Sequence, residues 1–192
     1  MVHCSMTGTN KVPEQSKIYE ETWTYSCFKI MGPYKLVPKQ LADCPNKGTN
    51  ELRIVSSKLR KIGRDIYSYS SDVILPHGLT DEITFGIRCA TYGNGGWKEN
   101  AYNFHFGKAC TTLKNVFPEV YELVKKEFRN IQDCPIPQGN YTIRNATFKA
   151  GSLKGFATLF YDEYRTDLYF QRNGKRVGCK RIFYDVFPKK KV

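Results

Sequence analysis

The sequence has few of the residues that hold a zinc ion or carry out acid–base catalysis. It contains three histidines, and its seven cysteines form no Cys-x-x-Cys pair. Structural zinc sites use closely spaced Cys and His ligands, so no metal site is expected. His3, His77 and His105 lie in unlike contexts, and no Ser-His-Asp or nucleophile-elbow pattern occurs. We therefore predict no catalytic residues, no cofactor and no metal, and we predict that the protein is not an enzyme.

Long apolar runs are also missing. No stretch is apolar enough to span a membrane, and residues 1–15 contain no apolar signal core. We interpret the chain as a mature secreted one from which a signal has been removed. Alanine is scarce, whereas Tyr (13) and Phe (12) carry most of an aromatic share of 14%. This composition favours strands.

The cysteines are spread along the chain, which is typical of a disulfide framework formed in an oxidising compartment. Their odd number leaves one thiol free, paired between chains, or without its partner. Two Asn-x-Thr triplets begin at Asn140 and Asn145 and are acceptors for N-linked sugars. These features predict a secreted, extracellular glycoprotein.

The formal net charge is +12, and basic residues gather at 58–64, 172–181 and 188–191. Such clusters are either a solvated basic surface or an attraction to anionic lipid headgroups, acidic glycans or nucleic acid. Nucleic-acid binding fits secretion poorly, so we expect no nucleic-acid partner.

Alternating apolar and polar residues predict a series of strands, at 22–28, 51–59, 65–75, 82–89, 101–107 and 175–187. Residues 91–100 form a Gly-rich hairpin loop with Trp97 at its tip, and Asn173-Gly174 predicts a tight hairpin turn. Helical spacing runs over 113–128, where Pro118 either begins the helix or kinks it. The expected organisation is a flexible N-terminal arm (1–18), a single β domain (19–188) and a basic tail (189–192).

Several spaced motifs in the second half of the chain carry a family resemblance. They are Cys134, Pro135, Gly139, Tyr141 and Ile143, then Tyr164-Arg165, then Gly174, Lys175, Gly178 and Cys179, with Cys110 ahead of the helix. This order resembles the ganglioside-activator family, which is related to the ML lipid-recognition proteins, and is closest to the insect chemosensory CheB proteins. The cysteines that the activator carries after its helix are missing, and Glu163 stands where the activator has Gly. The activator's own partner enzyme is therefore not carried over.

The resemblance implies a mainly β fold: an antiparallel, disulfide-stabilised β-cup, a ganglioside-activator-like or ML-like sandwich, with one inserted helix. It implies a lipid-binding domain at 19–188 and disulfides Cys110–Cys134 and Cys27–Cys179. Pairing Cys44 with Cys89 is a further hypothesis.

The expected function is that of a secreted carrier or presenter of a hydrophobic ligand (lipid, fatty acyl or hydrocarbon) in an apolar cavity, including a chemosensory role. Its partners would be that ligand, an anionic membrane surface, and a receptor or hydrolase. The alternative is a secreted signalling or venom-type protein that recognises another protein without a ligand. The candidate cavity-lining residues, which an ordinary core would equally explain, are Ile83, Phe85, Ile87, Tyr102, Phe104, Phe106, Leu168 and Phe170. The candidates for rim or membrane contact, which would otherwise fold back onto the core, are Trp97, Phe156, Leu159 and Phe160.

Overall fold

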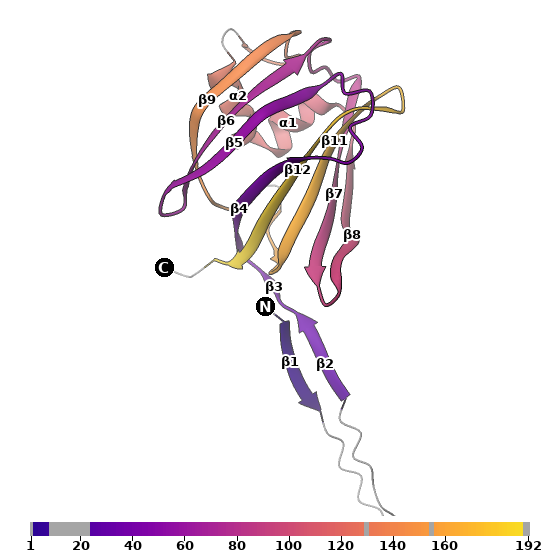
Figure 1. Cartoon of the computed structure of the whole chain (residues 1–192), viewed down its shortest axis with the longest axis vertical. Helices are drawn as coiled ribbons and strands as arrows, with labels where there is room; N and C mark the ends of the chain where they lie inside the picture. The colour runs from indigo at the N-terminus through magenta and orange to yellow at the C-terminus, as the bar shows by residue number, and fades with distance from the viewer. Residues whose placement is uncertain (1, 8–23, 129–130, 154–155, 190–192) are drawn as a thin grey trace, which may run out of the picture.

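The computed structural model describes residues 2–7, 24–128, 131–153 and 156–189 (Figure 1). This part of the chain is mainly antiparallel β-structure with two short helices, which confirms the predicted β-rich fold class. The elements, in chain order, are β1 (Val2–Thr7), β2 (Thr24–Lys29), β3 (Met31–Gly32), β4 (Tyr34–Asp43), β5 (Arg53–Gly63), β6 (Ile66–Leu75), β7 (Ile83–Gly93), β8 (Gly96–Phe106), α1 (Ala109–Val116), α2 (Pro118–Glu127), β9 (Gly139–Lys149), β10 (Leu159–Phe160), β11 (Glu163–Arg172) and β12 (Lys175–Pro188).

Two sheets form the body of the fold (Figure 1). The larger has five strands in the order β4-β12-β11-β7-β8, and the smaller has three in the order β5-β6-β9. β1 pairs with β2, and β10 pairs with β3, as separate two-stranded sheets. The strands predicted from alternation all appear, although β8 begins earlier than expected. Residues 2–7, expected in a loose arm, instead form β1, while residues 8–18 lie outside the described part.

Local sequence explains most of these elements. On β7, Ile83, Phe85 and Ile87 are buried while Arg88 is exposed, as strand alternation requires. The predicted Asn173-Gly174 turn joins β11 to β12 with positive φ at both residues, 51° and 72°. Asn and Gly tolerate this left-handed geometry, which suits the twist of a two-residue hairpin.

The single predicted helix is two helices. α1 ends at Val116 and α2 begins at Pro118, with Phe117 between them at φ −124°. Proline has no N–H to donate to the preceding turn, and its ring favours the first position of a helix. Pro118 therefore ends one helix and starts the next, rather than kinking one continuous helix.

The hydrophobic core lies among the inner faces of the sheets and the helices. α2 packs against β9 and α1 against β7. Each helix contributes to the core at its ends, through Ala109 and Cys110 of α1 and through Phe117 and Phe128, which flank α2. No helix in the described residues is long and apolar enough to cross a membrane.

Two disulfides link the described residues. Cys110–Cys134 is present as predicted and ties the start of α1 to the segment before β9. The predicted Cys27–Cys179 bond is wrong, because Cys179 bonds to Cys44. Cys44 follows β4, and the pairing of β4 with β12 brings its Cα to 5.8 Å from that of Cys179.

The hypothesis that Cys44 pairs with Cys89 is therefore wrong as well. Cys89 is a free, buried thiol on the inner face of β7. In the β1–β2 pairing, Cys4 stands opposite Cys27 in register. The pairing of β strands, which local sequence does not specify, decides these partners.

Asp133 anchors the segment between α2 and β9. Its carboxylate accepts hydrogen bonds from Lys114 Nζ (2.7 and 2.8 Å), from Tyr121 Oη (3.0 Å) and from the Cys134 N–H (2.7 Å). The Lys114 hydrogen bond, with those from Cys134 and Tyr121, lowers the pKa of Asp133 to about 2. Because the pKa of Asp133 is lower in the folded state, its ionised carboxylate stabilises the folded state at pH values above the ordinary pKa of 3.8. This stabilisation is lost as the pH falls through about 2.

We expect a carboxyl ¹³C NMR titration of the folded protein to place the midpoint of Asp133 near pH 2. In Lys114→Met the main hydrogen bond is lost, and the midpoint should rise toward the ordinary value. A midpoint close to 3.8 in the unaltered protein would show that this cluster does not form in solution.

Candidate functional site

The inner face of the five-stranded sheet carries the predicted cavity-lining residues in cross-strand rows. The register of β11, β7 and β8 aligns Phe170, Phe85 and Phe106 in one row. Leu168, Ile87 and Phe104 form the next row. Residues directly opposite one another in an antiparallel sheet share a face, so the rows present one continuous apolar surface. Ile83 lies on the same face of β7, and Tyr102 continues the line on β8 beyond Phe104.

The rings on this face contact one another along its length. Phe85 lies at the centre, with its ring centroid 5.0 Å from that of Phe106, 6.0 Å from Phe170 and 5.8 Å from Phe117. Phe104 then links Phe106 to Tyr102 through stacked rings at 6.3 and 6.0 Å. We call this surface the aromatic inner face; it comprises Ile83, Phe85, Ile87, Tyr102, Phe104, Phe106, Leu168 and Phe170.

The eight residues differ in exposure. Ile83, Phe85 and Ile87 are buried and belong to the core, with at most 8% of their surface accessible. The other five, on β8 and β11, pack against that core but keep part of their surface exposed to solvent. The aromatic inner face is therefore a packed layer on β7, flanked by partly accessible rings on β8 and β11.

A segment after β9 covers part of this face. Phe156 stacks edge-on against Phe104, with ring centroids 5.3 Å apart, and its carbonyl accepts a hydrogen bond from Tyr34 Oη at 3.0 Å. Phe160 reaches Tyr102, with centroids 6.5 Å apart, and Leu159 pairs with Gly32 of β3. Phe156, Leu159 and Phe160, predicted at the rim, thus fold back against the aromatic inner face and are partly buried there.

Trp97 takes a different place. It lies in β8 rather than at a loop tip, which corrects the predicted loop position. It pairs with Tyr92, so it projects from the opposite, outer face of the sheet. There it packs between the rings of Tyr92 and Phe183, at 5.3 and 5.7 Å, with Arg165 Cζ 4.9 Å from its ring centroid. The short Asn94-Gly95 turn explains the error, because the strands extend almost to the hairpin end.

A small polar cluster adjoins the aromatic inner face, in the cross-strand row of Thr166, Cys89 and Tyr102. Thr166 Oγ1 donates to Cys89 Sγ at 3.1 Å and shares a hydrogen bond with Tyr184 Oη at 2.9 Å. Burial raises the pKa of the Cys89 thiol, so the thiol stays protonated and is a poor nucleophile. Burial likewise raises the pKa of Tyr184. Sequence reasoning missed this cluster, since Tyr184 reaches it only through the pairing of β12 with β11.

The remaining candidate groups do not converge on this face. His77 follows β6 and lies 3.7 Å from Glu51, whereas His105 is exposed on β8. His3 lies in β1, and its side chain is outside the description. Cys44, Asp167 and Cys179 come within 4.8 Å of one another, the one such group in the described chain. The two sulfurs form a disulfide, and Asp167 is held by Arg181, so the group cannot supply a metal site.

Both predicted sugar acceptors lie on β9, where Asn140 and Asn145 are exposed. Asn145 has a positive φ of 50° at a β-bulge, where Arg144 and Asn145 together stand opposite Ser70. The bulge adds one residue to the alternation, so both acceptor asparagines face outward from the sheet. Their glycosylation stays a prediction.

Comparison with known families finds a match over residues 83–165 to a family described as "Protein of unknown function (DUF1091)". The matched region runs from β7 through both helices and β9 to the first residues of β11, and it contains the Cys110–Cys134 disulfide. It also contains most of the aromatic inner face and the covering segment. No curated protein matches the chain. The candidate site thus lies largely inside the region that this chain has in common with the described family.

Proposed function

We propose that the protein is a secreted carrier or presenter of a hydrophobic ligand, held against the aromatic inner face. The observation that carries the proposal is the partial exposure of Tyr102, Phe104 and Phe106 on β8, beside the buried residues of the neighbouring strand β7. Covering water-exposed aromatic surface with an apolar ligand lowers the free energy, because that surface is removed from water. Ligand sites in proteins are mostly apolar and carry few polar groups. The Thr166–Tyr184 hydroxyl pair would be such a polar group.

The ligand class follows from the lining. Five phenyl or phenol rings and three aliphatic side chains suit an acyl or hydrocarbon chain better than a polar metabolite. Phe156 and Phe160, which cover this face, would have to shift to admit a chain, and the β10–β3 pairing that holds Phe160 is two residues long. A presenter would further need a receptor or hydrolase partner. The chemosensory form of the proposal rests on the motif resemblance alone.

Secretion is part of the proposal. The two disulfides of the described chain fit an oxidising compartment. Exchange with an anionic membrane surface would use the excess of basic residues.

The test is ligand uptake by protein from a eukaryotic secretory host, measured by native mass spectrometry and by titration with a dansyl-labelled fatty acid. We expect saturable binding of one probe per chain. Phe104→Ser should weaken it about tenfold, because one ring no longer covers the probe. The matched control is His105→Ser, the next residue on β8 and on the opposite face, which should change affinity less than twofold.

Circular dichroism would confirm that both variants are folded. A bare chain in the mass spectrum, together with no probe binding by the unaltered protein, would overturn the carrier proposal. Equal losses in the two variants would place the probe elsewhere on the molecule.

A second candidate function, recognition of another protein without a ligand, is favoured by the outer face of the five-stranded sheet. Trp97, Arg165 and the half-exposed Tyr92 lie together there. Trp, Arg and Tyr are the residue types that dominate protein–protein binding energies. Activity of ligand-free protein that is lost in Tyr92→Ala and kept in Phe104→Ser would select this function.

A further inference from the structure

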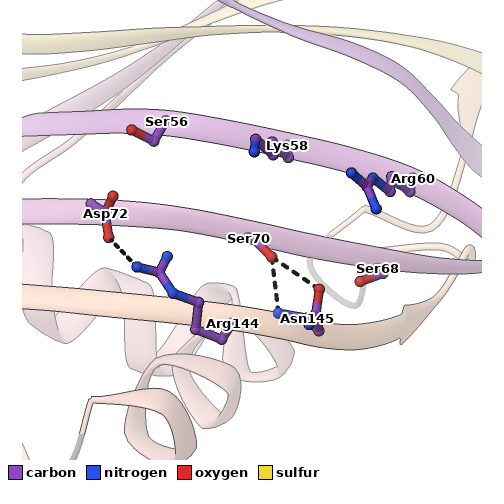
Figure 2. A pocket seen from close by; sticks show the side chains of 8 residues that line it. All are labelled: Ser56, Lys58, Arg60, Ser68, Ser70, Asp72, Arg144 and Asn145. Carbon is purple, nitrogen blue, oxygen red and sulfur yellow. Dashed lines mark hydrogen bonds and ion pairs between the residues drawn. The ribbon is translucent and has the colours of Figure 1, made fainter.

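A polar hollow lies on the three-stranded sheet, on the face opposite the buried side chains of Val73 and Ile143. Figure 2 shows the side chains that line it. Its volume is about 370 Å³. All three strands of that sheet supply its walls, and no aromatic or aliphatic residue is among them. The lining residues are Ser56, Lys58, Arg60, Ser68, Ser70, Asp72, Arg144 and Asn145.

Two β-bulges shape this hollow. On β5, Ser56 has φ 52° and the register shifts between Val55 and Lys58. On β9, Asn145 has φ 50° and, with Arg144, stands opposite Ser70. A bulge adds an unpaired residue and increases the local bend of its strand. With one on each outer strand, the sheet is bent on both sides of β6, whose polar side chains form the floor.

The charges in the hollow are not balanced internally. Asp72 is its one carboxylate, and it already accepts from Thr142 Oγ1 at 2.9 Å and pairs with Arg144 Nη2 at 3.3 Å (Figure 2). Asp72 therefore serves to position Arg144. Lys58 and Arg60 have no carboxylate within ion-pairing distance in the described part of the chain. Two cations stand over a floor of serine hydroxyls with no internal counter-ion.

The hydroxyls of Ser56 and Ser68 add to the donor set. Ser70 Oγ accepts from the Asn145 N–H at 2.9 Å and donates to Asn145 Oδ1 at 3.4 Å, so it is fixed in place and helps to hold Asn145. Ser68 is 8% exposed and lies deeper, beside Arg60 across the β5–β6 pair. Lys, Arg and hydroxyl donors converging on one space are the groups that bind sulfate and phosphate oxygens.

We propose that this hollow binds the sulfate or phosphate ester groups of an acidic sugar chain. The space exceeds one such group. The two unpaired cations, Lys58 and Arg60, both lie on β5, and Arg144 stands across β6 on β9, an arrangement that suits a chain with several anionic groups. A lipid bilayer is disfavoured because the lining offers no apolar side chain to enter it. A single nucleic-acid strand is disfavoured because the lining has no ring on which a base could stack. This site is independent of the hydrophobic-ligand proposal.

Asn145 gives the site a dependence on glycosylation. Its side chain is part of the lining, so a sugar attached to it would occupy the hollow. Thr147→Ala removes the acceptor triplet and leaves Asn145 and its bulge unchanged. The binding experiment therefore uses Thr147→Ala protein as its reference.

The test is calorimetric titration of that reference with a sulfated heparin octasaccharide, alongside vesicles containing phosphatidylserine. We expect saturable binding of the octasaccharide, weakened about tenfold by Lys58→Gln with Arg60→Gln. The matched control, Lys98→Gln with Lys175→Gln, removes the same charge from exposed residues elsewhere and should change affinity less than twofold. Thermal unfolding midpoints would show that both double variants fold.

Equal losses in the two double variants would mean that net charge alone attracts the octasaccharide, and would overturn the proposal. So would vesicle binding that depends on Lys58 and Arg60 in the absence of octasaccharide binding. Neither outcome bears on uptake of the labelled fatty acid, which is measured separately with Phe104→Ser.

Discussion

Replacing Cys44 and Cys179 together by serine is expected to lower the free energy of unfolding more than any other change considered. The bond closes a loop of 135 residues, from the end of β4 to the middle of β12. A cross-link removes conformations from the unfolded chain, and the loss grows with the logarithm of loop length. For this loop the chain-entropy relation gives about 5 kcal/mol.

The second disulfide supplies an internal comparison. Cys110–Cys134 closes 24 residues, for which the same relation gives about 3.5 kcal/mol. Urea unfolding of the two double-serine variants should therefore rank the Cys44–Cys179 variant as the less stable. The double replacements also keep the free thiol of Cys89 from exchanging with a broken bond. A reversed ranking would show that local strain or residual unfolded structure, rather than loop entropy, decides the contribution.

Phe85→Ala is expected to lower the free energy of unfolding by about 3 to 5 kcal/mol. Phe85 is 7% exposed, and its ring contacts those of Phe106, Phe117 and Phe170. Truncation loses the transfer free energy of the ring and leaves a cavity that its neighbours cannot fully close. Tyr92→Ala, on the outward side of the same strand and 50% exposed, should cost less than about 1 kcal/mol.

The Phe85 result also separates core from ligand site. If Phe85 faced an open cavity, its removal would destabilise the ligand-free protein by little and would weaken ligand binding instead. A loss below about 1 kcal/mol by chemical denaturation would therefore contradict its assignment to the packed core. Phe104, which keeps part of its surface exposed, is expected to show the opposite balance between stability and binding.

The two proposed sites lie on surfaces of opposite character. The aromatic inner face offers area for an apolar chain, whereas the outer hollow offers unpaired cations and hydroxyls. A protein that holds a hydrophobic ligand on one surface and an acidic sugar chain on another would be retained where such sugar chains are displayed. The two binding experiments use different probes and different variants, so each proposal stands or falls alone.

The sequence by itself determined the strand-rich class, the course of most strands, the Asn173-Gly174 turn and the inward faces of β7, β8 and β11. These features follow from local periodicity and turn chemistry, which short stretches of chain carry. The sequence resemblance also predicted Cys110–Cys134, whose cysteines lie 24 residues apart. The break at Pro118 was visible as one of two alternatives, and the backbone chemistry of proline explains which occurred.

Only the tertiary structure decided which distant segments meet. The pairing of β4 with β12 places Cys44 next to Cys179, so these two form the disulfide and Cys89 remains a free thiol. The pairing of β12 with β11 brings Tyr184 close to Thr166. The bulges at Ser56 and Asn145 shape a hollow that is lined by residues from three strands. In the sequence, the same residues are indistinguishable from those of an ordinary solvent-exposed strand face. Long-range pairing depends on the summed burial and hydrogen bonding of whole strands, and no local pattern of residues specifies that sum.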